Sequence, residues 1–304
     1  MTGSRLMTAS LLLLLVGALA ACGEQQGDKR KIVVGSKDFT EAYLIGEMYA
    51  LVLEAAGVPV ERKLNLGSTA IAHEALLKGG AQEGIDLYPE YTGTGLQAVL
   101  EQPPNSDPQQ TYKLTRDGYM EKWGLVWLDM APMNDTQAVV TTQEVAQSRG
   151  LQSLDDMCEK AADLTIVARP EFSSRTDALP ALQKIYGGCD FKEIKAVQSG
   201  DLLYRALLDG QADVAQADST AGEIKGHNLV LLEDPRGYGG PYNIAPVVRQ
   251  DALDLYPQLA GALNNLAPRI TTEEISALNW EVSGKQREYE DVAREWLQKQ
   301  GLLK

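Results

Sequence analysis

The sequence is poor in the residues on which metal sites and hydrolytic enzymes depend. Its two histidines, His73 and His227, lie far apart, and neither has neighbours at metal-ligand spacing. The chain has no G-x-x-x-x-G-K-[ST] phosphate-binding loop and no G-x-S-x-G nucleophile elbow. We therefore expect no metal, no cofactor and no ATPase activity, and a secreted enzyme is the weaker alternative to a protein that only binds its ligand.

Positive charge is also scarce. The 28 Lys and Arg residues are outnumbered by 42 Asp and Glu residues, which gives a net charge of −14. The acidic residues are scattered, and there is no basic stripe of the kind that binds nucleic acid. With 44% hydrophobic residues over 304 positions, the composition is typical of a globular protein of about two domains.

The N-terminal segment predicts export. An apolar run at residues 11–20 follows Arg5 and is too short to span a bilayer permanently. It ends in Leu-Ala-Ala-Cys at residues 19–22, which resembles a bacterial lipobox. We expect a signal peptide at 1–21, acylation of Cys22, and a polar tether at 22–30 that holds the protein outside the cytoplasmic membrane. The alternative is an ordinary signal peptide in which the cysteine is incidental.

Two further cysteines, Cys158 and Cys189, would then lie in an oxidising compartment. Paired cysteines in exported proteins are usually disulfide-bonded, so we expect a bridge between them. Two buried free thiols are the alternative.

Short apolar runs alternate with helical patterns twice along the chain. The first set has strands at 31–34, 60–66 and 85–88 with helices between them, and the second set occupies residues 164–217. This alternation predicts α/β lobes with largely parallel sheets. Extended passages at 126–140 and 229–248 would connect the lobes, and the helical tail at 251–303 would pack on the first one. We assign 31–134 and 243–304 to lobe 1, and 135–242 to lobe 2, with a ligand cleft between them.

The candidate ligand-binding loops follow the strands of this pattern, where α/β sheets bind ligands. They are residues 35–41, 88–95 and 169–175, together with the two passages between the lobes. They carry a lysine, an arginine, threonines and tyrosines.

These loops belong to runs that resemble a known family. The runs are GSKDFTEAYLIGEMYA, LNLGSTAIAHEALLKG, IDLYPEYTGTGL, ARPEFSSRTDALPAL, ADSTAGEI and PYNIAPVVR. They are similar, in order, to the osmoprotectant-binding proteins of bacterial ABC importers, which take up glycine betaine, choline and carnitine. The resemblance implies a type II periplasmic-binding-protein fold, in which two lobes close on the ligand.

The resemblance also implies roles for individual residues. Lys37, Thr94 and Arg175 match the positions that grip the ligand's carboxylate, and Tyr91 and Tyr242 match two tyrosines of the cage around its trimethylammonium group. An aromatic cage attracts such a cation with roughly 2 kcal/mol or more when it is desolvated. Asp135 matches a residue that offers its backbone carbonyl.

Two other cage positions depart from the family pattern. Gln137 and Asp218 stand where tyrosines are usual. A quaternary ammonium has no N–H to donate to either side chain, and a buried carboxylate without good partners costs several kcal/mol. One alternative is a zwitterion with a less methylated amine, an amidine or an imidazolium. The other is a weak betaine binder in which these side chains contact water.

We therefore expect a non-catalytic receptor for a small zwitterionic solute of the glycine betaine class. It would deliver this solute to a membrane permease that is driven by a separate ATPase. A sensory lipoprotein that uses the same cleft is the alternative of a different class.

Overall fold

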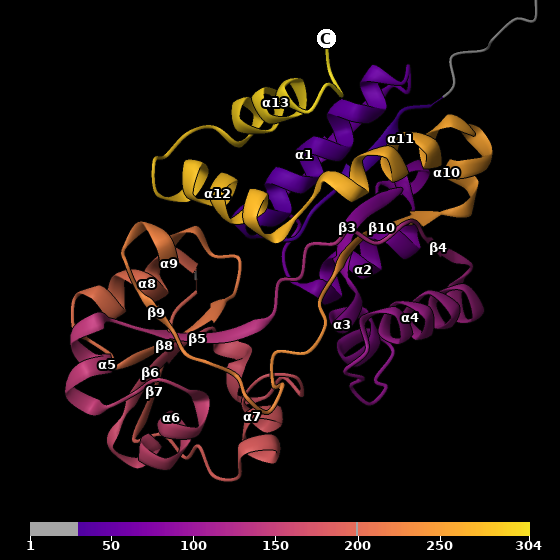
Figure 1. The fold of residues 1–304 in the computed structure, drawn as a ribbon. Helices are drawn as coiled ribbons and strands as arrows, with labels where there is room; N and C mark the ends of the chain where they lie inside the picture. Colours follow the sequence, from indigo (N-terminus) through magenta and orange to yellow (C-terminus); the bar gives the residue numbers. More distant parts are fainter. Residues whose placement is uncertain (1–29, 199) are drawn as a thin grey trace, which may run out of the picture.

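The computed structural model describes residues 30–198 and 200–304, so the expected signal peptide, Cys22 and nearly all of the tether lie outside the described residues. The described chain forms two α/β lobes (Figure 1). Each lobe is built on one five-stranded sheet, with strand orders β2-β1-β3-β10-β4 and β7-β6-β8-β5-β9. No helix in the described ranges is long and apolar enough to cross a membrane.

Lobe 1 combines the beginning and the end of the chain. Its elements are β1 (Ile32–Gly35), α1 (Thr40–Ala55), β2 (Val60–Lys63), α2 (Thr69–Lys78), β3 (Leu87–Tyr91), α3 (Thr92–Thr94), α4 (Pro108–Trp123), β4 (Leu125–Trp127), β10 (Ile244–Arg249), α10 (Gln250–Leu255), α11 (Gln258–Leu266), α12 (Thr272–Ser283) and α13 (Tyr289–Lys299). Strand β1 pairs in parallel with β2 and β3, whereas β10 runs antiparallel to β3 and β4.

Lobe 2 is formed by the middle of the chain. Its elements are β5 (Gln137–Thr141), α5 (Gln143–Arg149), α6 (Leu154–Lys160), β6 (Thr165–Ala168), α7 (Leu179–Tyr186), β7 (Glu193–Ala196), α8 (Gly200–Leu208), β8 (Val214–Asp218), α9 (Gly222–Gly226) and β9 (Val230–Leu231). Strand β6 pairs in parallel with β7 and β8, and β5 runs antiparallel to β8 and β9. Both lobes therefore have a parallel core of strands next to an antiparallel strand that arrives from the other lobe.

Each sheet is covered by helices on both faces. In lobe 1 one apolar cluster lies under α1 and α11 to α13, and a second lies under α2 and α4. Lobe 2 likewise has separate clusters on the two faces of its sheet. Because both faces of each sheet are covered by apolar clusters, a polar site is expected at the ends of the strands, where the loops lie.

Two passages connect the lobes side by side, and an isolated bridge between Asn134 and Asn243 joins them. The C-terminal tail lies on lobe 1, with α13 against α1 (Figure 1). Its neighbour α12 also contacts α9 of lobe 2, which the sequence did not suggest. Trp280 of α12 comes so close to Gly222 and Gly226 that an added Cβ would lie 2.4 Å or less from a tryptophan atom.

Two details of the local structure concern the motifs. The third strand was expected at 85–88 and residues 89–91 in a loop, but residues 89–91 belong to β3, which is buried throughout and pairs with β1 and β10. The loop itself is replaced by the short helix α3 and a π-helical turn at Gly95–Val99. In lobe 2 a disulfide joins Cys158 to Cys189, with Cα atoms 4.1 Å apart.

Candidate functional site

A cavity of about 740 Å³ lies between the lobes. Its walls come from loops at the strand ends of both sheets, from the first turns of α2 and from the two connecting passages. Every ligand-binding residue expected from the sequence lines this cavity, namely Lys37, Tyr91, Thr94, Asp135, Gln137, Arg175, Asp218 and Tyr242. The fold thus brings together residues as far apart in the chain as Lys37 and Tyr242, although what they bind stays a prediction.

Lys37 follows β1 and is held by a buried carboxylate. Its Nζ donates a hydrogen bond of 2.7 Å to Oε1 of Glu90, and only 5% of the lysine is exposed. Glu90 lies within β3, is fully buried, and also accepts from the Tyr88 hydroxyl and from the backbone N–H of Tyr91. The lysine is therefore fixed in position and its charge is balanced before any ligand enters.

Arg175 of lobe 2 is held in the same way. It follows a turn at Pro170–Ser173, and its Nε and Nη2 donate to the two oxygens of Asp177 at 2.6 and 2.8 Å. Asp177 is 2% exposed and also accepts a 3.0 Å hydrogen bond from the Tyr242 hydroxyl. These two parallel hydrogen bonds orient the guanidinium, and Nη1 donates to neither oxygen of Asp177.

The two tyrosines expected in the cage come from different parts of the chain: Tyr91 ends β3 of lobe 1, and Tyr242 lies in the passage that leads from lobe 2 into β10. The ring of Tyr91 faces Nζ of Lys37 at 4.6 Å from the ring centroid, and Phe39 lies beside it at a centroid distance of 6.1 Å. Tyr242 lies against Gly93, whose missing side chain lets the ring approach, since an added Cβ would be 2.8 Å from it. One face of Tyr91 therefore already attracts a cation, which is the ammonium of Lys37.

Gln137 and Asp218 face each other in the register of β5 and β8, and both have partners. Arg169 donates to both oxygens of Asp218, with one contact of 3.2 Å and a shorter one. Gln216 donates to Gln137 at 3.4 Å and accepts from the backbone N–H of Arg169. Neither alternative stated from the sequence, a ligand with N–H donors or contact with water, included these protein partners.

The Arg169 pair also determines the charge of Asp218. Burial alone would raise the pKa of this carboxyl, but the guanidinium of Arg169 outweighs it, and the pKa lies below its usual value. Asp218 is therefore a carboxylate whose charge is already compensated.

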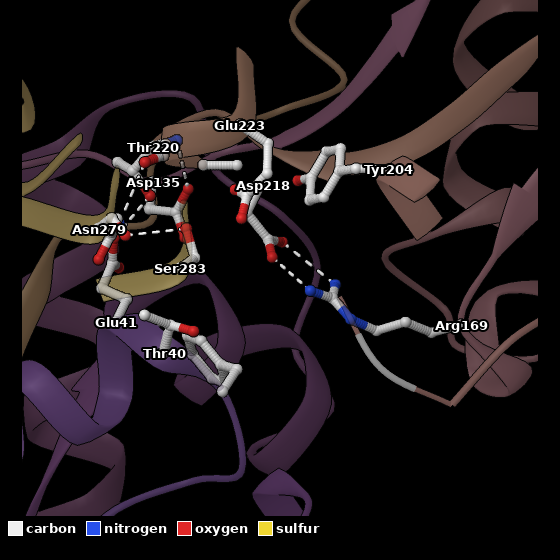
Figure 2. A pocket seen from close by; sticks show the side chains of 13 residues that line it. Thr40, Glu41, Asp135, Arg169, Tyr204, Asp218, Thr220, Glu223, Asn279 and Ser283 are labelled. Atoms are coloured by element: carbon white, nitrogen blue, oxygen red, sulfur yellow. Dashed lines mark hydrogen bonds and ion pairs between the residues drawn. The ribbon is translucent and has the colours of Figure 1, made fainter. Parts of the chain in front are cut away.

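A smaller pocket of about 60 Å³ adjoins the main cavity and shares Asp135 and Asp218 with it. Figure 2 shows the Asp218–Arg169 pair on one side of this pocket and a hydrogen-bonded network around Glu41 on the other. Burial raises the pKa of both Glu41 and Asp135, and the mutual proximity of the carboxylates adds to the rise at Asp135. The two lobes meet here through buried polar groups.

Sequence reasoning missed several residues of this site. Glu90, Asp177 and Arg169 hold the expected residues by ion pairs, and Glu41 and Asn279 belong to the network between the lobes. All of them except Asn279 lie in the sequence runs that resemble the known family, and this location could have marked them as candidates for the site. Asn279 had no such signal, because it lies in an ordinary helical pattern and reaches Glu41 only through the docking of α12.

Two α/β lobes with a polar cavity between their strand ends define a type II periplasmic solute-binding protein. The chain belongs to the family described as the substrate-binding domain of ABC-type glycine betaine transport systems, whose model matches residues 30–299. The expected family and fold are therefore confirmed. Proteins of this class bind small solutes outside the cytoplasmic membrane and deliver them to a permease.

Several relatives match over nearly the whole chain. The carnitine transport binding protein OpuCC of Listeria monocytogenes is 32% identical over 297 residues, with 97% of this chain and 94% of that protein covered. The glycine betaine-binding protein YehZ of Escherichia coli is 32% identical over 285 residues, with 90% and 92% covered. A crystal structure of a glycine betaine/carnitine/choline ABC transporter is 29% identical, with a TM-score of 0.74 and coverage of 90% of this chain and 99% of that one.

Proposed function

We propose that this protein captures a small zwitterionic solute of the glycine betaine class in the cavity between its lobes. Lys37, Thr94 and Arg175 would hold the ligand's carboxylate, and Tyr91 and Tyr242 would face its cationic end. The observation that supports this most strongly is that both cations of the expected clamp line one cavity together with both tyrosines.

The charge balance of the cavity favours a zwitterion over a simple anion. Each of its three cationic side chains is paired with a carboxylate, as Lys37–Glu90, Arg169–Asp218 and Arg175–Asp177. A carboxylate ligand can use the remaining N–H donors of these cations, but it adds a negative charge to a cavity whose cations are already paired and whose lining also includes Asp38, Glu74 and Glu171. A positive charge on the same ligand, placed over the tyrosines, offsets that addition.

A quaternary ammonium is compatible with the polar wall of lobe 2. Asp218 is hydrogen-bonded by Arg169, so a trimethylammonium group that donates no hydrogen bond leaves no carboxylate without a partner. This removes the physical objection to a betaine that the sequence alone raised. Gln137 and Asp218 would then lie beside the cation without requiring a hydrogen bond from it.

Calorimetry on protein that begins after Cys22 tests the proposal. Glycine betaine should bind, and Arg175→Ala should weaken binding by at least about tenfold, because a charge-assisted hydrogen bond contributes about 1.5–3 kcal/mol. The control is Arg116→Ala, which removes an exposed arginine of α4 that pairs with Asp117. If Arg175→Ala binds as tightly as the control, the assignment of the carboxylate clamp is wrong.

The proposal extends to the setting of the protein. We propose that it is not an enzyme, that its permease is driven by a separate ATPase, and that residues 31–134 with 243–304 and residues 135–242 move as the two lobes. We also propose that an acylated Cys22 anchors it to the membrane. In cells, Cys22→Ser should abolish incorporation of a labelled fatty acid; retention of the label would refute the anchor.

A further inference from the structure

We infer that Glu41 is a positioning residue that couples the ligand-facing Tyr91 of lobe 1 to the opposite lobe. The inference rests on the proposed function, in which Tyr91 faces the cation of the solute. Glu41 stands in the first turn of α1 and is 3% exposed.

The contacts of this carboxylate reach three separate elements. Its Oε1 accepts a 2.6 Å hydrogen bond from the hydroxyl of Tyr91, at the end of β3. Its Oε2 accepts from the hydroxyl of Thr220 at 2.6 Å, and from Nδ2 of Asn279 at 2.8 Å. Tyr91 belongs to lobe 1 and Thr220 to lobe 2, so Glu41 joins the wall of the cavity to the lobe across from it. Figure 2 shows the part of this network formed by Glu41, Thr220 and Asn279.

The amide of Asn279 strengthens this connection. Its Nδ2 also donates to the backbone oxygen of Thr220 at 3.0 Å, so the same NH₂ group serves two oxygen acceptors. The opposite orientation of the amide would place its oxygen against the carboxylate of Glu41 and against a carbonyl. The helix α12 thereby holds Thr220 and Glu41 together.

The charge of Glu41 explains how its partners influence one another. Burial raises the pKa of Glu41, while the hydrogen bonds from Thr220, Tyr91 and Asn279 lower it. Loss of any one donor therefore shifts Glu41 toward its neutral form, which weakens the hydrogen bonds from the other two. Tyr91 and Thr220 are bonded to different oxygens, yet each depends on the other through this one group.

The same charge improves the face that Tyr91 offers to a cation. A phenol that donates to a carboxylate makes a stronger hydrogen bond than one that donates to a neutral acceptor, so the ring is better fixed. The anion at its hydroxyl also leaves more electron density in the ring, which deepens the negative face that attracts a cation. Glu41 thus orients the ring of Tyr91, and through its hydrogen bond with Thr220 this effect depends on the position of lobe 2.

A double-mutant cycle tests the coupling. In calorimetry with glycine betaine, Tyr91→Phe and Thr220→Val should each weaken binding about tenfold, and the double variant should lose about tenfold rather than about a hundredfold. The matched control combines Tyr91→Phe with Ser219→Ala. The hydroxyl of Ser219 accepts a hydrogen bond from the backbone N–H of Thr136 instead of donating to Glu41, so the losses in affinity of these two single variants should multiply in the double variant. If Tyr91→Phe and Thr220→Val also multiply to within about twofold, the inference is overturned.

A second measurement needs no ligand. Hydrogen exchange of the backbone amides of α9, directly after Thr220, should be about tenfold faster in Tyr91→Phe than in wild type, and unchanged in Tyr242→Phe, whose hydroxyl bonds to Asp177 instead. Unchanged exchange in Tyr91→Phe would refute the coupling. Faster exchange in a protein that binds no betaine, carnitine or choline would retain the coupling and refute the proposed function.

Discussion

Replacing Lys37 by methionine should destabilise the protein even when no ligand is present. The lysine is 5% exposed and its partner Glu90 is fully buried, with 2.7 Å between Nζ and Oε1. Removal of one member of a buried pair leaves the other charge uncompensated, which typically costs about 3–5 kcal/mol. Glu90 keeps two donors, the Tyr88 hydroxyl and the backbone N–H of Tyr91, so we expect the lower part of that range.

The assay is chemical denaturation of wild type, Lys37→Met, Glu90→Gln and the double variant. Lys37→Met should lose about 3 kcal/mol of unfolding free energy, and the double variant should recover more than half of that loss, because no charge is then left buried alone. A loss below about 1 kcal/mol, or a double variant as unstable as the sum of the singles, would refute the buried-pair account. The prediction also means that weakened binding in a Lys37 variant is not by itself proof of a contact with the ligand.

Three other predictions concern charges and the disulfide. The folded pKa of Asp135 is raised, first by burial and then by neighbouring carboxylates. Its contribution to stability is therefore present at low pH and lost as the pH rises through that pKa. Asp135→Asn should unfold at a higher temperature than wild type at pH 7, and this gain should vanish toward pH 4. The folded pKa of Asp218 is lowered, so the pair with Arg169 stabilises the protein above about pH 4 and loses its effect as the pH falls; the deficit of Arg169→Met in denaturation should be largest near pH 7 and shrink in acid, and a deficit independent of pH would contradict it. Replacing Cys158 and Cys189, which are 31 positions apart, by serine should cost about 3–4 kcal/mol in the same assay, and an unchanged midpoint would show that the bridge does not constrain the unfolded chain.

The positions of the clamp residues could be predicted because they depend on local order in the chain. Lys37 follows a buried strand and precedes a helix, and Arg175 lies in the turn after β6. Loops that follow parallel strands meet at one edge of the sheet, so the strand–loop–helix pattern predicted that these residues lie close together, and both line one cavity. Their role in binding was implied only by the resemblance to a known family and stays a prediction.

The partners of these residues could not be predicted, because they depend on register and on the docking of distant elements. Asp218 meets Arg169 only because β8 lies beside β6 with a particular alignment, and the sequence does not display that alignment. Glu41 lies in the first turn of a helix, where an acidic residue is expected for the helix dipole alone. Its contact with Asn279 spans 238 positions.

The most direct test of the whole account compares glycine betaine with choline, which carries the same trimethylammonium group but no carboxylate. In wild-type protein, calorimetry should show glycine betaine binding at least about tenfold tighter than choline, since each charge-assisted hydrogen bond contributes about 1.5–3 kcal/mol. In Arg175→Ala this preference should shrink by about tenfold, since Lys37 and Thr94 remain, while choline still binds, which shows that the cavity remains folded. Equal affinities in wild type, or a preference that is undiminished in Arg175→Ala, would contradict the carboxylate clamp.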